Sequence, residues 1–156
     1  MRVVQATPAH RATVLELVGK LLRELEDSPD EFAGLESTRV LRDLEAAGDR
    51  FTAFLALSDA DEPVGVATLF EAFAIYAGGS YGVIDEMYVD PAWRGSGVGS
   101  RLLEAVREHG RDRGWVRIDV TAPPEKRWER TVRFYEREGF VFTGPKMRLM
   151  LARSPR

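Results

Sequence analysis

Three closely spaced glycines form the part of this sequence that is best suited to binding an anion. Gly95, Gly97 and Gly99 follow a strand-like segment and open a helix-like one. Such glycines can expose backbone N–H groups at a helix start, where the helix dipole adds partial positive charge. A P-loop would need lysine where Ser100 stands, and the dinucleotide fingerprint needs another glycine spacing. The segment is therefore typical either of an anion site of a different kind or of a tight strand-to-helix turn.

Two adjacent carboxylates and one tyrosine could carry acid–base chemistry. Asp85 and Glu86 lie in a strand-like segment, where successive side chains point to opposite faces, so we expect one of them to face a substrate. A primary ammonium with a pKa of about 10 is neutral in about one molecule per thousand at pH 7, so a base is useful. Glu71 is a weaker candidate, and an ion-paired or solvated carboxylate is the alternative for Asp85 and Glu86. Tyr135 is protonated at neutral pH and could donate a proton, or could instead pack in the core.

Residue counts exclude several classes of chemistry and of partner. The 156 residues include no cysteine, which excludes disulfides, zinc–thiolate sites and an acetyl-cysteine intermediate. With His10 and His109 far apart, we expect no metal site. A net charge of −3, from 22 basic and 25 acidic side chains, argues against a dedicated nucleic-acid binder. No apolar run approaches the ~18–20 residues of a membrane span, and the N-terminal residues lack a signal peptide's apolar stretch, so we expect a cytoplasmic protein without a membrane partner.

The elements that must position these residues follow from the hydrophobic periodicity. We expect strands at residues 3–6, 51–57, 64–76, 81–89, 116–120, 140–143 and 147–151, and helices that begin near residues 8, 37, 98 and 126. In the second helix Val40, Leu41 and Leu44 should face inward. The strands at 51–89 should form an antiparallel meander, whereas the strand–helix–strand unit at 81–120 predicts one parallel pair. The fold class is thus mixed α/β (α+β), with a sheet of about seven mostly antiparallel strands, about four helices and a single domain over residues 1–156.

Three motifs, in this order, resemble those of the GNAT superfamily of N-acetyltransferases. The segment Arg94-Gly95-Ser96-Gly97-Val98-Gly99 matches the R/Q-x-x-G-x-G/A signature of that family. Residues 84–91 resemble its fourth strand, and residues 134–140 resemble its F-Y-x-x-x-G-F segment. The order of elements is similar over nearly the whole chain. The resemblance implies a GNAT-type fold with one splayed parallel strand pair, and acetyl-coenzyme A as co-substrate without a metal.

The resemblance also implies roles for single residues. The turn that would hold the pyrophosphate of acetyl-coenzyme A comprises Arg94, Gly95, Ser96, Gly97, Val98, Gly99 and Ser100, and the strand that would hold the pantetheine arm contributes the main chain of Met87, Tyr88 and Val89. Tyr135 is implied as the general acid, and Asp85 or Glu86 as the residue that holds or deprotonates the amine. Where the family often has asparagine, seven residues before the tyrosine, this chain has Trp128.

These features predict an N-acetyltransferase that moves an acetyl group from acetyl-coenzyme A to a primary amine by direct attack in a ternary complex. One alternative is a non-catalytic acyl-coenzyme A binding or regulatory module on the same fold. Another is a protein N-terminal or lysine acetyltransferase. Paired acids and an acidic net charge favour a small cationic amine. The sequence names neither the amine nor the oligomeric state, and a homodimer stays open.

Overall fold

The computed structural model describes residues 1–25, 38–122, 128–149 and 151. Met1–Val120 forms one compact unit and Thr121–Arg156 another. Within the described residues, no helix is both long enough and apolar enough to cross a membrane. The single domain over residues 1–156 stays a prediction.

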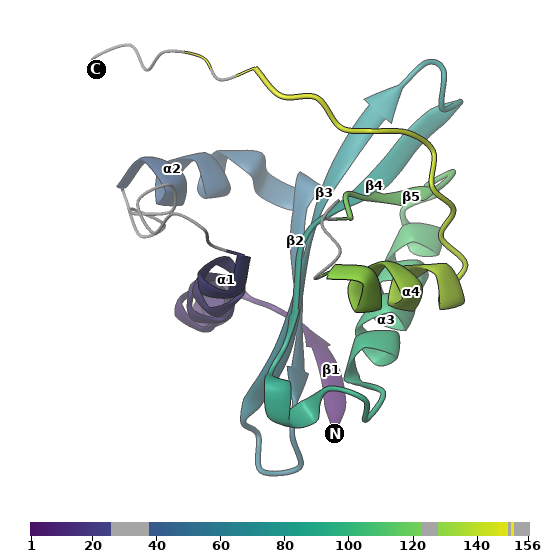
Figure 1. The fold of residues 1–156 in the computed structure, drawn as a ribbon. Coiled ribbons are helices and arrows are strands. Elements are labelled where there is room, and N and C mark those ends of the chain that lie inside the picture. The colour runs from purple at the N-terminus through teal and green to yellow at the C-terminus, as the bar shows by residue number, and fades with distance from the viewer. Residues whose placement is uncertain (26–37, 123–127, 150, 152–156) are drawn as a thin grey trace. The chain divides into compact units, whose positions relative to one another are not determined.

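The first unit contains a five-stranded sheet in the order β1-β2-β3-β4-β5 (Figure 1). The strands are β1 (Arg2–Gln5), β2 (Phe51–Leu57), β3 (Pro63–Ala74), β4 (Gly79–Val89) and β5 (Ile118–Val120). Neighbouring strands are antiparallel except for β4 and β5, which are parallel. The predicted meander and the predicted parallel pair are thereby confirmed.

Helices cover both faces of this sheet, as Figure 1 shows for α1 (Arg11–Leu25) and α3 (Val98–Asp112). On one face, α1 packs Val14, Leu17 and Val18 into a cluster with Val66 of β3 and Tyr88 of β4. On the other face, the α3 residues Val98, Leu102, Leu103 and Val106 are buried. Coverage on both faces explains the nearly continuous apolar sequence of β2 and early β3, since neither face of these strands meets water.

Helix α2 (Thr38–Ala47) is less buried than its pattern predicts. It contributes no buried residue: Val40 is exposed, and Leu41 and Leu44 are half-buried. The helical spacing of apolar residues was a correct guide to the helix, but the inward orientation predicted for Val40 is wrong. Short 3-10 turns complete the unit at Pro8–His10, Gly48–Arg50 and Pro91–Trp93.

The second unit contains helix α4 (Glu129–Arg137). The two strands predicted at residues 140–143 and 147–151 are absent from the described residues 140–149 and 151. Large apolar side chains of this segment, Val141, Phe142, Met147, Leu149 and Leu151, are exposed. Apolar residues show only that a segment can be part of a sheet, whereas a strand also needs a neighbour that accepts its hydrogen bonds. The described sheet therefore has five strands where about seven were predicted.

Candidate active site

The parallel strands β4 and β5 part halfway along β4. β5 pairs with β4 only through Ile118, Asp119 and Val120, which lie opposite Gly82, Val83 and Ile84. β4 then continues to Val89, while β5 ends at Val120. The backbone of β4 after Ile84 thus runs past the end of its parallel partner. A strand edge of this kind can accept an extended ligand as an additional strand.

A β-bulge in β4 decides which of the two adjacent carboxylates is sheltered. Thr68 of β3 lies opposite Glu86, and the next β3 residue lies opposite Ile84, so Asp85 is the extra residue. The Asp85 side chain is exposed, whereas Glu86 is half-buried. The two carboxylates that the sequence could not distinguish therefore have different surroundings.

Glu86 lies on the face of the sheet that α1 covers. Val66 and Tyr88 pack against α1, and a Cβ built on Gly65 would touch Val98 and Leu102 of α3, so alternate β3 residues face opposite helices. By this alternation Thr68 shares the face of Val66. Its cross-strand neighbour Glu86 lies on that face too, two residues before Tyr88.

The Glu86 carboxylate has one direct polar neighbour on β3. The Thr68 hydroxyl donates to Glu86 Oε2, and it accepts the backbone N–H of Glu86 at 3.1 Å. Burial raises the pKa of Glu86, the hydrogen bond from Thr68 lowers it, and the nearby Asp85 carboxylate raises it, with a net upward shift. A carboxylate with a raised pKa is a stronger base, and it holds a proton closer to neutral pH than an exposed glutamate does.

The glycine-rich segment forms a tight turn between β4 and α3. Gly95 has φ +80° and Gly97 has φ +87°, both in the left-handed region that suits glycine. Gly97 is the N-cap of α3, whose first residue, Val98, anchors the helix in the core. The N–H groups of a helix N-terminus point out of its end with partial positive charge. Gly95, Ser96, Gly97 and Ser100 are exposed, and Gly99 is half-buried, so a ligand can approach this backbone.

Arg94 holds the turn in place. Its Nε donates to the carbonyl oxygen of Val89 at 2.8 Å, and its Nη2 lies 2.7 and 2.8 Å from the two carboxylate oxygens of Glu24 on α1. The guanidinium also lies over the Tyr88 ring, 5.7 Å from its centroid. The side chain thus links the end of β4, the turn and α1.

Tyr135 lies on α4 in the second unit. Its ring meets Phe134 and Phe140 with centroids 5.3 and 5.4 Å away, and the side chain is buried. Burial raises the pKa of Tyr135 to about 12, so its hydroxyl stays protonated at any physiological pH. Trp128 is the N-cap residue of the same helix.

The structure brings most of the predicted site residues together in the first unit. Asp85, Glu86, Met87, Tyr88 and Val89 lie on β4, with Met87 and Val89 half-buried and Tyr88 in the core, and the turn at residues 94–100 follows directly. Tyr135 belongs to the second unit. No group of three or more His, Cys, Asp or Glu side chains in the described parts of the chain is placed to hold a metal ion.

The third candidate carboxylate, Glu71, forms an ion pair with an arginine. Glu71 on β3 accepts hydrogen bonds from Arg113 at 2.8 Å and from the Trp115 indole at 2.5 Å. Hydrogen bonds from these two side chains lower the pKa of Glu71 to about 2, so it is a poor base. The weaker candidate of the sequence is thus an ion-paired strand carboxylate.

Two residues that contact the site were not found from the sequence. Thr68 reads as one polar residue in an apolar strand, and Glu24 as one of several acids on an amphipathic helix. The isolated hydroxyl in the run 64–70 was a signal that Thr68 needs a polar partner. Nothing local identified that partner as Glu86, because strand register is set by pairing.

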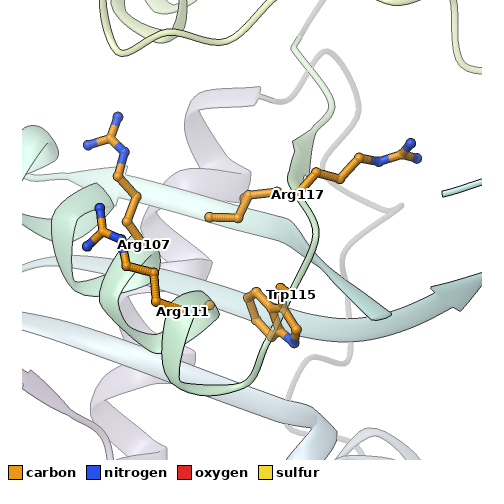
Figure 2. A pocket seen from close by; sticks show the side chains of 6 residues that line it. Arg107, Arg111, Trp115 and Arg117 are labelled. Carbon is orange, nitrogen blue, oxygen red and sulfur yellow. The ribbon is translucent and has the colours of Figure 1, made fainter. Parts of the chain in front are cut away.

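A separate open pocket of about 180 Å³ lies at the far end of α3 from the glycine turn. Figure 2 shows Arg107 and Arg111 extending from α3 on one side of Trp115, and Arg117 extending on the other side. Arg107 and Arg111 both contact Glu104, at 3.4 and 3.2 Å. The pocket contains none of the predicted site residues.

Comparisons with known proteins show what the sequence and the fold of this chain are similar to. The model of a family described as "Acetyltransferase (GNAT) family" matches residues 19–140. An IAA acetyltransferase of Azospirillum brasilense is 27% identical over 139 residues, 89% of this chain and 86% of the relative. An aminoglycoside N(6')-acetyltransferase type 1 of Stenotrophomonas maltophilia is 36% identical over 114 residues, 70% of this chain and 67% of the relative. The crystal structure of an aminoglycoside acetyltransferase from an uncultured soil metagenomic sample superposes with a TM-score of 0.75 at 25% identity, covering 97% of this chain and 98% of that one.

Proposed function

The chain belongs to the GNAT acetyltransferase family, and from this premise we propose that it moves the acetyl group of acetyl-coenzyme A to a primary amine of a small cationic acceptor. The proposed transfer is direct, within a ternary complex, and the chain has no cysteine that could form an acetyl-cysteine intermediate. The observation that carries the proposal is the position of Glu86. It is a half-buried carboxylate with a raised pKa, and it lies two residues after Ile84, the last β4 residue that pairs with β5.

The residues of the first unit fit acetyl-coenzyme A in two places. The left-handed turn at Gly95 and Gly97 leads into the exposed N-terminus of α3, which suits a pyrophosphate. The stretch of β4 from Met87 to Val89, beyond the end of β5, suits the amide-bearing pantetheine arm. The bound co-substrate supplies the acetyl group as a thioester. Arg94 supports the turn through Glu24 and Val89, and its own contact with the co-substrate is part of the proposal.

We assign Glu86 as the general base and give Asp85 a different role. An ammonium with a pKa of about 10 must lose a proton before it can attack, which costs about 4 kcal/mol at pH 7. The raised pKa of Glu86 brings it closer to the ideal value for proton transfer near neutral pH. The exposed Asp85 carboxylate on the bulge attracts the cationic acceptor without taking its proton.

Tyr135 is the proposed proton donor to the leaving sulfur. With a pKa of about 12 it is always protonated. Full transfer to a thiolate of pKa about 8.5 would cost about 5 kcal/mol, so Tyr135 first acts as a hydrogen-bond donor to the developing charge.

The acceptor that we favour is an amino sugar. The Stenotrophomonas maltophilia relative and the metagenomic structure are both named as aminoglycoside acetyltransferases. The net charge of −3 and the exposed Asp85 are consistent with an acceptor that carries several ammonium groups. A cytoplasmic location for the reaction is part of the same proposal.

Thiol release tests the reaction, since this chain contributes no thiol of its own. The purified protein is incubated with acetyl-coenzyme A and a panel of aminoglycosides, glucosamine 6-phosphate, polyamines, amino acids and lysine or N-terminal peptides. We expect turnover with an amino sugar. Turnover with peptides alone would indicate a protein acetyltransferase. Binding of acetyl-coenzyme A in calorimetry without any turnover would indicate the non-catalytic module.

Matched variants test the assignment of the base. Glu86→Gln should lower kcat by about 10²–10³-fold, whereas Asp85→Asn should mainly raise the KM for a cationic amine. The reverse order would move the role of base to Asp85. If neither variant loses activity, the proton goes to water or to another group.

A third variant tests the phosphate site. Gly97→Glu places bulk, negative charge and a left-handed backbone strain at the turn, and should abolish acetyl-coenzyme A binding in calorimetry. Retained tight binding would contradict the assignment of the turn.

A further inference from the structure

We propose that Thr68 is a positioning residue that fixes the Glu86 carboxylate on the α1 face of β4. The inference rests on the proposed role of Glu86 as general base. It concerns a side chain that lies on a different strand and that no sequence motif identifies.

The first argument is burial. Thr68 is 1% exposed, the lowest value among the buried polar side chains of the described residues. A buried hydroxyl costs free energy unless it is hydrogen-bonded. Valine would fill the same space with no polar group to satisfy, so the hydrogen bonds of the hydroxyl are what distinguishes threonine at this position.

The second argument is that the Thr68 hydroxyl forms both of its hydrogen bonds with one residue, Glu86. Its O–H donates to Glu86 Oε2, and its oxygen accepts the Glu86 backbone N–H at 3.1 Å. A hydroxyl has one donor, so the donor is committed to the carboxylate. Together the two contacts fasten both ends of a flexible side chain, its backbone and its carboxylate, to a β-branched residue with a restricted χ1.

The third argument is the bulge. The register between β3 and β4 shifts at Asp85, the extra residue of the bulge. The Thr68 oxygen takes the N–H of the residue that follows the bulge. The same side chain that binds the N–H after the bulge thus also orients the half-buried Glu86 carboxylate.

The electrostatic surroundings make this contact measurable. On its own strand, Glu86 is influenced by the Asp85 carboxylate, which raises the pKa. From β3 it receives the uncharged Thr68 hydroxyl, which lowers the pKa. Among the described residues, α1, α3 and β5 contribute no charged group to the pKa of Glu86. Loss of the hydroxyl should therefore raise this pKa, whereas a variant that only loosens the core has no reason to do so.

The test compares Thr68→Val, which removes the hydroxyl at similar volume, with Thr68→Ser, which keeps it. Thr68→Ala serves as a second hydroxyl-free variant that places no additional apolar group beside the carboxylate. Thr52→Val is the matched control, since Thr52 is a buried threonine of β2 whose hydroxyl lies 3.5 Å from His109. For each protein, kcat and kcat/KM are measured against pH with one amine, together with the thermal unfolding midpoint.

We expect Thr68→Val and Thr68→Ala to shift the acidic limb of kcat/KM upward by about one pH unit and to lower kcat at pH 7 about tenfold. Thr68→Ser should restore both, and Thr52→Val should leave the limb in place. An unshifted limb in the hydroxyl-free variants, while Glu86→Gln loses activity, overturns the role of Thr68 and keeps that of Glu86. An active Glu86→Gln overturns the role of the base itself.

Discussion

Replacing Gly82 with alanine tests the packing around the segment in which β4 and β5 are paired. Gly82 lies opposite Ile118 in the first β4–β5 pair. A Cβ on Gly82 would lie 2.1 Å from Cζ3 and 2.4 Å from Cε3 of Trp115, closer than real Cβ atoms approach. The indole is not free to turn aside, because its Nε1 donates to Glu71 at 2.5 Å and its edge meets His109 at a centroid distance of 5.2 Å. Either the indole leaves its place or β4 shifts.

The expected cost follows from these contacts. Forcing one additional carbon into a packed site costs about 1–3 kcal/mol. Losing a hydrogen bond to a charged group, here Trp115 to Glu71, costs about 1.5–3 kcal/mol. We expect Gly82→Ala to lower the free energy of unfolding by about 3–5 kcal/mol, a large part of the ~5–15 kcal/mol of a typical domain. The unfolding midpoint should fall by about 10 °C.

Urea unfolding followed by circular dichroism measures this change. Gly110→Ala is the matched control, because its Cβ would lie 3.0 Å from the same indole, a distance that a small ring movement relieves. Alanine in a helix also gains about 1 kcal/mol over glycine, so this variant should be nearly neutral. Trp115→Leu in the Gly82→Ala background should make the two changes strongly non-additive. A Gly82→Ala protein within about 0.5 kcal/mol of the parent, or strict additivity, would refute the reasoning.

Three further outcomes are expected. The pKa of Glu71 is about 2 in the folded chain against an ordinary value of 4.5, so its ionised form stabilises the fold above about pH 4.5. This contribution is lost as the pH falls toward 2. Urea titrations at pH 6 and pH 3 should show a fall in the free energy of unfolding that the Glu71→Gln variant lacks. Arg94→Met removes the partly exposed contact with Glu24, so it should cost only about 1 kcal/mol in thermal unfolding but raise the KM for acetyl-coenzyme A severalfold; an unchanged KM would separate the turn from binding. Tyr135→Phe should lower kcat by about 10²-fold or more with the co-substrate Kd unchanged, and an unaltered kcat would leave this tyrosine a packing role.

Local features of the chain were predicted well. The glycine turn, the start of α3 and the β3–β4 hairpin depend on residues close in sequence, where φ preferences and apolar periodicity act directly. The prediction of a parallel β4–β5 pair also succeeded, because a strand–helix–strand unit of this length has few other connections.

Features that depend on pairing between distant segments were predicted poorly. The apolar residues of the segment 140–149 predict strands, yet in the described chain the segment pairs with no strand. The helix at Thr38–Ala47 has an apolar stripe, yet none of its residues is buried. In both cases the sequence pattern describes one partner only, whereas burial and strand pairing require two.

The candidate site shows the same contrast between features set by local sequence and features set by tertiary structure. The sequence alone predicts the turn at residues 94–100 as an anion site, and it contains the two acids at 85 and 86 and no thiol, because each is a matter of residue identity and short spacing. Tertiary structure alone separated Asp85 from Glu86. It did so through a bulge, which exists only relative to a partner strand, and through Thr68, which lies 18 positions away in the chain. A carboxylate becomes a base of particular strength through what surrounds it, and those surroundings are supplied by strand register.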